Sequence, residues 1–228
     1  MIEYIQGDIH EKIKDLEDNS IDFIYTDPPF STTRASWDIE LDWPKLFVEM
    51  WRVLKPKGII ALHSAIPFTY DLIKYEKPKY NYVWLKNNST GFLTVKYQPL
   101  RNIEEIFIYY KKSGTYNPQM IGDKFTQKRN VKFGGDNAYW GEAGVKKENE
   151  YNKEEGHTGK YPTTFLDYPI IKGHKNMKPK ALQEYFVKTY SNEGDTILDM
   201  CCHTNQLGEI CEKLKRNFIG VDLEEIKI

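Results

Sequence analysis

The sequence has little cysteine, no long apolar run and almost no net charge, and the first two of these shortages each exclude a class of protein. Three cysteines in 228 residues, two of them adjacent, cannot form a disulfide framework, so we expect a reducing, cytoplasmic setting. Apolar runs such as IDFIYT and GIIALH are far shorter than the roughly 18 residues of a membrane span. Charged residues near the start also interrupt any signal-peptide core. We therefore expect a globular protein without membrane association.

The net charge of −1 hides an uneven distribution of charged side chains. Residues 1–60 carry 7 basic and 12 acidic side chains, residues 61–190 carry 21 and 13, and residues 191–228 carry 4 and 8. A basic middle segment between acidic ends fits either an ordinary solvated lysine-rich face or a surface for an anionic partner such as DNA.

Short apolar runs alternate with helical patterns along most of the chain. This alternation predicts an α/β domain with a mostly parallel sheet. Residues 112–162 contain many glycines and no sustained period, which indicates a small loop-rich insert; a surface excursion without function is the alternative. Strands are predicted at 1–6, 21–26, 59–63, 80–86, 104–110, 195–199 and 217–222, and helices at 9–17, 43–54, 178–191 and 206–215.

The tetrapeptide Asp27-Pro28-Pro29-Phe30 follows the predicted strand 21–26, at a strand end where open α/β sheets bind ligands. The two prolines stiffen the backbone and remove amide donors, so the Asp27 carboxylate and the Pro28 carbonyl form a rigid pair of acceptors. Such a pair suits an NH2 group, and Phe30 offers a stacking surface for a planar base. Taken alone, the same tetrapeptide also serves as an ordinary turn.

A second polar segment, Asp199-Met200-Cys201-Cys202-His203-Thr204-Asn205, follows the predicted strand 195–199. We expect no metal site here, because adjacent cysteines point in different directions and no second ligand pair has zinc spacing. Small buried residues at a strand end are the favoured interpretation of the cysteines.

Four stretches of the sequence resemble the amino DNA methyltransferases, in the circularly permuted motif order usually called beta. They are GDIHEKIKDLEDNSIDFIYTDPPF, RVLKPKGIIALHS, VWLKNN with PLRNIEEIFIYYKK, and KNMKPKALQEYFVKTYSNEGDTILD. The resemblance covers nearly the whole chain apart from 112–162. It implies a Rossmann-like fold that binds S-adenosylmethionine, in a single domain spanning 1–228, with 112–162 at the place of the family's target-recognition region.

The resemblance also implies a role for individual positions. The catalytic positions, which hold a flipped-out base by its amine and its ring, are Asp27, Pro28, Pro29 and Phe30. The cofactor-binding positions are Asp8 at the adenine, Asp222 at the ribose, Lys178 near the methionine end, and Asp199, Cys201, His203 and Asn205 in the cofactor loop. From the residues alone, Asp8 could equally cap the helix after it, and Lys178 could be an exposed lysine before a helix-starting proline.

The implied function is transfer of a methyl group from S-adenosylmethionine to an exocyclic amine of DNA, as in restriction-modification systems. Adenine at its 6-amino group is favoured over cytosine at its 4-amino group, because cytosine enzymes of the family more often carry Ser at the position of Asp27. Methylation of RNA or protein is disfavoured, since such enzymes usually carry Asn there. Family members are often dimers, so a homodimer is a further expectation.

One departure from the family pattern opens an alternative function. The family has glycines at the positions of His203 and Asn205, where they allow close approach of the backbone to the cofactor. His and Asn are among the residues that best tolerate a positive φ, but their side chains fill space. The alternative is therefore a methyltransferase-like DNA-binding protein or subunit with impaired catalysis.

Overall fold

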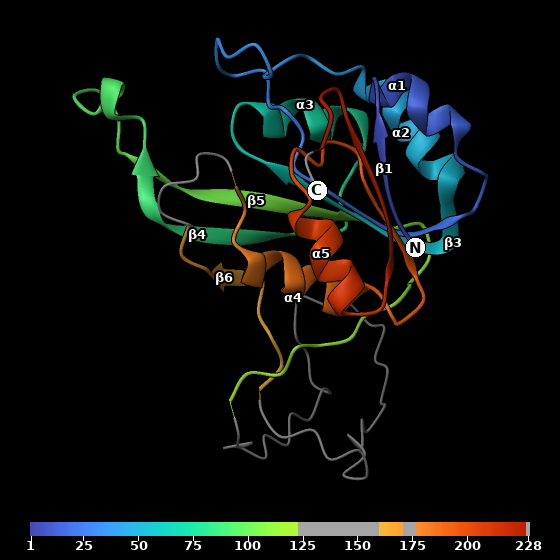
Figure 1. The fold of residues 1–228 in the computed structure, drawn as a ribbon. Coiled ribbons are helices and arrows are strands. Elements are labelled where there is room, and N and C mark those ends of the chain that lie inside the picture. The colour runs from blue at the N-terminus through green and yellow to red at the C-terminus, as the bar shows by residue number, and fades with distance from the viewer. Residues whose placement is uncertain (123–159, 171–176, 227–228) are drawn as a thin grey trace, which may run out of the picture. The chain divides into compact units, whose positions relative to one another are not determined.

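The described part of the chain in the computed structural model comprises residues 1–122, 160–170 and 177–226 (Figure 1). The chain divides into two compact units, Met1–Asn117 with Thr163–Ile228, and Pro118–Pro162. In the second unit an antiparallel bridge pairs Ile121 with Lys160. Most of the insert predicted at 112–162 lies outside the described residues, so its role in target recognition stays a prediction.

The first unit is built on one eight-stranded sheet with the order β1-β8-β7-β2-β3-β5-β4-β6. The strands β1, β8, β7, β2 and β3 run parallel to one another, β5 is antiparallel to both β3 and β4, and β6 is parallel to β4. The mostly parallel, Rossmann-like α/β fold expected from the sequence is confirmed. The strands are β1 (Ile2–Gln6), β2 (Ile21–Thr26), β3 (Leu54–Ser64), β4 (Tyr80–Thr90), β5 (Arg101–Tyr109), β6 (Phe165–Asp167), β7 (Thr196–Asp199) and β8 (Asn217–Asp222).

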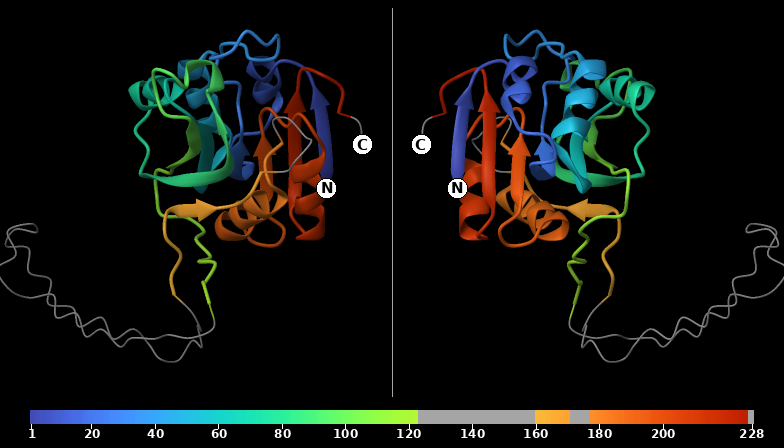
Figure 2. Two further views of the ribbon diagram at one scale, coloured as in Figure 1. Left: turned by 90° about the vertical axis from the view of Figure 1, so that its left-hand side faces the viewer. Right: turned by 90° about the vertical axis from the view of Figure 1, so that its right-hand side faces the viewer.

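Helices cover both faces of this sheet (Figures 1 and 2). Successive residues of a strand point to opposite faces, so in β2 Ile24 packs with one helix set while Phe23 and Tyr25 pack with the other. The first set is α1 (Ile9–Lys12), α2 (Trp43–Val53) and α3 (Phe68–Tyr75), and the second is α4 (Lys180–Tyr190) and α5 (Gln206–Lys213). Both faces of β2 are thus buried, which explains its continuous apolar sequence.

Some elements differ from the sequence-based expectation. The helix expected at 9–17 is one α-helical turn followed by a 3-10 turn, Ile13–Asp15. Strand β3 begins at Leu54, before the predicted start, because Leu54 already pairs with Ile21. Helix α3 was not predicted: its N-cap, Pro67, makes no side-chain capping hydrogen bond that would mark the start. Strand β6 was also missed, since three residues are too few for a periodic signal.

The parallel strands place their carboxyl ends along one edge of the sheet, called here the carboxyl edge. Strand β5 runs the other way and brings its amino-terminal half to the same edge, where Glu105 pairs with Ser64 at the end of β3. Residues that follow β1, β2, β7 and β8 therefore meet residues from the start of β5.

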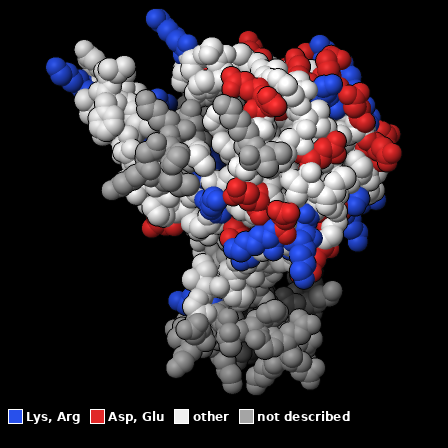
Figure 3. Space-filling view, viewed as in Figure 1, with Lys and Arg blue, Asp and Glu red and all other residues white. Residues whose placement is uncertain are grey.

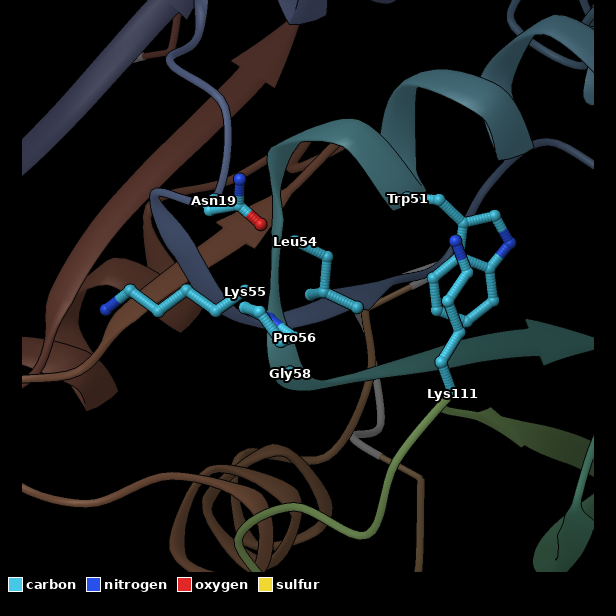
Figure 4. Close-up of a pocket in the computed structure, with 7 residues that line it drawn as sticks. All are labelled: Asn19, Trp51, Leu54, Lys55, Pro56, Gly58 and Lys111. Atoms are coloured by element: carbon cyan, nitrogen blue, oxygen red, sulfur yellow. The ribbon is translucent and has the colours of Figure 1, made fainter.

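The opposite edge, at the amino ends of β2 and β3, contains a cavity of about 140 Å³ (Figure 4). Lys111 Nζ lies over the ring of Trp51 there, 4.8 Å from its centre. No residue predicted for the functional site lines this cavity. Its lining residues are Asn19, Trp51, Leu54, Lys55, Pro56, Gly58 and Lys111.

None of the helices in the described residues has the length and apolar character needed to cross a membrane.

Candidate active site

Four acidic residues stand in a row along the carboxyl edge. Asp8, Asp222, Asp199 and Asp27 stand at or just beyond the ends of β1, β8, β7 and β2, which are consecutive neighbours in the sheet. The row is tied together by backbone contacts, since Gly7 N–H donates to the Asp222 carbonyl at 2.8 Å. The structure therefore brings together residues that are up to 214 positions apart in the sequence, from Asp8 to Asp222.

The Asp27 carboxylate contacts an ammonium group from a distant part of the chain. Lys178 Nζ lies 2.9 Å from Asp27 Oδ1 and 2.7 Å from Glu104 Oε1. The Lys178 side chain is 11% exposed, and its Nζ lies 5.6 Å from the ring centre of Trp84. Burial lowers the pKa of Lys178, but the charges of Asp27 and Glu104 outweigh this and raise the pKa above its ordinary value. Lys178 is thus a buried cation joining two carboxylates, and its interpretation as an exposed lysine is wrong.

Glu104 extends these contacts into the core. His63 Nδ1 lies 2.7 Å from Glu104 Oε1, and His63 Nε2 lies 2.8 Å from the Tyr25 hydroxyl. Lys86 Nζ lies 3.5 Å from Glu104 Oε2. Burial raises the pKa of Glu104, but Lys178 and His63 more than compensate and hold it well below its usual range. Glu104 therefore remains ionised, with a partner on each oxygen.

Sequence reasoning missed this network, in which the buried residues Glu104 and His63 contact the partly buried Lys86. One signal was available for His63, which follows the apolar run Ile59–Leu62, because a buried polar group requires a partner. Glu104 has polar neighbours in its strand and gives no such signal. Nothing in the sequence says that the partner of Glu104 is Lys178, 74 residues away.

The ligand atoms of Asp27, His63 and Glu104 lie within 4.8 Å of one another, a spacing at which a metal ion could bind. In this structure Lys178 Nζ contacts two of the three residues at hydrogen-bonding distance. The positive charge that the carboxylates require is therefore supplied by the lysine.

Phe30 and the segment after it are held by local contacts. The ring of Phe30 stacks on Phe68 of α3, with centroids 5.1 Å apart and an interplanar angle of 19°. The Asp38 carboxylate then accepts hydrogen bonds from the backbone N–H groups of Ser31, Thr32 and Thr33 at 2.6–2.9 Å. The chain after the tetrapeptide is thus turned back on itself, and one face of the Phe30 ring is covered.

The turn between β7 and α5 keeps a glycine-like conformation at one of the two substituted positions. His203 has φ +46°, in the left-handed region, and its side chain is exposed. Asn205 has φ −74°, which any residue adopts. His203 N–H donates to Asp222 Oδ2 at 2.8 Å, and Cys201 N–H donates to Asp199 Oδ1 at 3.1 Å. The turn therefore forms without glycine and is joined to the row of acids.

Asp199 is a buried carboxyl group that forms no ion pair with the described residues. Burial, together with the nearby charges of Asp27 and Asp222, raises its pKa from 3.8 to about 7. A buried acid without a cation, beside two further acids, fits a ligand that carries positive charge. S-adenosylmethionine has such charges, on its sulfonium and its amino group, so this edge fits that cofactor.

Asp8 caps α1, as its alternative interpretation predicted. Its Oδ1 accepts from His10 N–H at 2.9 Å and lies 2.8 Å from His10 Nδ1. These hydrogen bonds lower the pKa of Asp8. A contact of Asp8 with the adenine of a cofactor stays a prediction.

The chain matches known proteins along most of its length. Residues 21–228 match the model of the family N6_N4_Mtase, described as DNA methylase. The type II methyltransferase M.HpaI of Haemophilus parainfluenzae is 27% identical over 234 residues, which span 93% of this chain and 67% of the relative. The DNA adenine methyltransferase YhdJ of Escherichia coli strain K12 is 24% identical over 243 residues, 96% of this chain and 77% of the relative.

Two solved structures share the fold of this chain. The complex of M1.HpyAVI with SAM has a TM-score of 0.62 at 22% identity and covers 99% of this chain and 95% of its own. The PvuII DNA methyltransferase, named as cytosine-N4-specific, has a TM-score of 0.66 at 13% identity and covers 98% of this chain and 82% of its own. At these sequence identities the two structures show similarity of fold alone.

Proposed function

Because this chain belongs to the N6/N4 DNA methylase family, we propose that it methylates an exocyclic amine of a flipped-out DNA base, and that this base is adenine. The resemblance to amino DNA methyltransferases drawn from the sequence is confirmed. The observation that carries the proposal is the position of Asp27, Pro28 and Phe30 on the same edge as Asp199 and Asp222. An amine acceptor and a site for a cationic donor thus lie on neighbouring strands.

The methyl donor is S-adenosylmethionine, which is bound in the solved M1.HpyAVI complex. When bound, its sulfonium supplies a methyl group already activated for transfer. Asp199, Asp222, Asp8 and the turn that carries Cys201, His203 and Asn205 would hold it. Gln206 Nε2 donates to the Lys178 carbonyl at 2.7 Å, so the cofactor turn and the Asp27 network are joined through the backbone of Lys178.

Asp27 and Pro28 would orient the attacking amine. Asp27 Oδ1 is occupied by Lys178, whereas Oδ2 has no hydrogen bond to the described residues. The amine would donate one proton to Oδ2 and one to the Pro28 carbonyl. Because these bonds strengthen as the nitrogen becomes tetrahedral and loses electron density to the methyl group, they stabilise the transition state more than the ground state. The proton released afterwards passes to water or through Asp27.

Support for adenine comes from Asp27 at the first position of the tetrapeptide and from YhdJ, which is named as an adenine methyltransferase. PvuII, named as cytosine-N4-specific, shares the fold, so the same architecture serves both amines. M.HpaI is a type II methyltransferase, and we extend that restriction-modification setting, with the cytoplasmic location expected from the sequence, to this chain. Residues 112–162 are proposed to recognise the target sequence.

The test is to methylate unmodified plasmid DNA with the protein and S-adenosylmethionine, digest the DNA to nucleosides and identify the modified base. We expect 6-methyladenine. Asp27→Ala should abolish transfer while leaving cofactor affinity within about threefold, because it removes an amine acceptor just after β2 and none of the residues proposed to hold the cofactor. Asp15→Ala, an exposed acid elsewhere, is the matched control. 4-Methylcytosine would refute the base assignment, and an Asp27→Ala protein with normal rate would refute the mechanism.

The alternative function, a DNA-binding protein with impaired catalysis, rests on His203 and Asn205 in place of glycines. Calorimetric titration of S-adenosylmethionine separates the two functions. Micromolar binding supports the enzyme, whereas no heat change at millimolar cofactor supports the binding protein.

A further inference from the structure

The hairpin that joins β4 to β5 exposes apolar side chains. Residues 87–102, called here the arm, extend beyond the sheet at the left of Figure 1. Phe92, Leu93, Val95 and Tyr97 are 64%, 99%, 51% and 88% exposed. Exposed apolar side chains that gather on one projection mark a contact surface, since scattered single ones are the ordinary case.

The arm is held by its own polar contacts. Residues Phe92–Thr94 form a 3-10 turn after Gly91, whose φ is +95°. Thr94 Oγ1 donates to the Gly91 carbonyl at 3.0 Å and accepts from Gln98 Nε2 at 2.8 Å. Backbone and polar groups build this turn, so the apolar side chains are left outside without a core of their own.

All charged side chains of the arm are basic. Its sequence, NNSTGFLTVKYQPLRN, contains Lys96 and Arg101 and no acidic residue, although the whole chain is slightly acidic. In the view of Figure 3 this projection, at upper left, shows basic and uncharged surface. Positive charge together with exposed aromatic side chains suits DNA, whose phosphates pair with lysine and arginine and whose bases accept aromatic or apolar contacts. A symmetric contact between two arms would instead place like charges together.

The arm extends from the carboxyl edge of the sheet, where Asp27 also lies. The carboxyl end of β4 and the amino end of β5 lie at the carboxyl edge, and Arg101 Nη1 donates to the Ile66 carbonyl, just after β3, at 3.2 Å. In the sheet, β2 and β4 are three strand spacings of about 4.8 Å apart, which is about 14 Å in total. Successive nucleotides of a DNA strand are about 3.4 Å apart. The strand β4 that leads into the arm therefore lies about four nucleotides from a base held at Asp27, and the arm extends farther from the sheet.

Resting on the proposed function, we propose that residues 87–102 are a second DNA-contacting surface, which binds the duplex beside the flipped base through Phe92, Leu93 and Lys96. The arm contacts flanking DNA and leaves the reacting amine to Asp27. Its loss should therefore weaken DNA binding and raise KM for DNA, with kcat and cofactor affinity unchanged.

The experiment measures binding of a short fluorescent duplex, with methyl transfer recorded separately. The double variant Phe92→Ser with Leu93→Ser should raise the Kd for the duplex about tenfold. Lys96→Gln should lower the slope of log K against log salt by about 0.9, the loss of one phosphate contact. The matched controls are Val48→Ser, at a 66% exposed apolar residue on α2, and Lys77→Gln, at an exposed lysine beyond the opposite edge. Neither control should change binding.

Arm variants that bind the duplex like their controls would overturn the inference. So would a wild-type dimer that the double variant turns into a monomer with unchanged DNA affinity, because a second copy would then occupy the arm. If the wild-type protein transfers no methyl group, the proposed function fails, while the binding measurement still decides the role of the arm.

Discussion

Lys178 links the two halves of the proposed reaction at the scale of single residues. Its side chain pairs with Asp27 and Glu104, and its carbonyl accepts from Gln206 at the start of α5. The resemblance to amino DNA methyltransferases implies a position for Lys178 near the methionine end of the cofactor. The structure adds a contact with Asp27, the proposed catalytic carboxylate, and leaves its Oδ2 without a hydrogen bond to the described residues.

Glu104→Gln tests this arrangement. Without the Glu104 charge, Lys178 loses its second carboxylate partner, and we expect its ammonium to bind Asp27 more closely and compete with the amine. We predict a loss of kcat of about tenfold, about 1.4 kcal/mol of transition-state stabilisation, with cofactor Kd within about threefold. Steady-state kinetics measure the change in kcat, and titration of the cofactor measures its Kd.

The matched control is Glu105→Gln on the same strand. Glu105 accepts from Thr69 and Asn81 at 3.0 Å and is not bonded to Lys178. If both variants lose kcat equally, the effect belongs to strand stability, and the positioning role of Glu104 is wrong.

At the scale of elements, the β7–α5 turn shows how the chain tolerates the loss of two glycines. His203 adopts the left-handed conformation that a glycine would take more easily, whereas Asn205 has an ordinary φ and gains nothing from glycine. The cost at His203 is about 1 kcal/mol.

His203→Gly should therefore raise the free energy of unfolding by up to about 1 kcal/mol, or Tm by about 2–4 °C. Removal of the side chain should also strengthen S-adenosylmethionine binding several-fold, because glycine at this position leaves more room for the ligand. Thermal unfolding and cofactor titration measure the two effects.

Lys215→Gly is the control for His203→Gly. Lys215 also has a positive φ, +60°, and lies before β8 at the opposite edge. The substitution Lys215→Gly should stabilise the fold without changing cofactor affinity. Equal cofactor affinity in wild type and His203→Gly would show that the substituted turn does not limit binding.

At the scale of the whole molecule, the buried Asp199 should make stability depend on pH in an unusual direction. Its pKa is about 7 in the fold, against 3.8 for the free side chain. Between these values the folded protein binds more protons than the unfolded chain, so stability falls as pH rises from about 4 to 7. The contribution is at most about 4 kcal/mol.

Urea unfolding between pH 5 and 8 checks this pH dependence. Asp199→Asn should remove the decline with pH that the wild-type protein shows. The carboxyl groups of Glu104, Asp8 and Asp38 have lowered pKa values, so the stability they contribute is lost only at lower pH. Parallel curves for the two proteins would mean that Asp199 is ionised in the fold throughout this range.

The sheet and most of its helices could be predicted from local pattern. Continuous apolar runs such as that of β2, and helical spacing such as Leu46, Phe47 and Met50 in α2, arise from burial of adjacent residues. The row of Asp8, Asp27, Asp199 and Asp222 was also accessible, because acids that follow parallel strands meet at one edge. Helix α3, strand β6 and the exposed arm were not, since their limits depend on neighbours far away in the sequence.

The sequence by itself determined the fold class, the family and the acids that line the carboxyl edge, because each depends on residue type and order along the chain. Only the tertiary structure decided that Lys178 neutralises Asp27, that Glu104 and His63 support it, and that Asp199 has no cationic partner among the described residues. These facts depend on which charges share a buried space. The charges that share this space are determined by how the fold brings β2, β5 and β7 together with the segment before α4. No local sequence pattern indicates this arrangement.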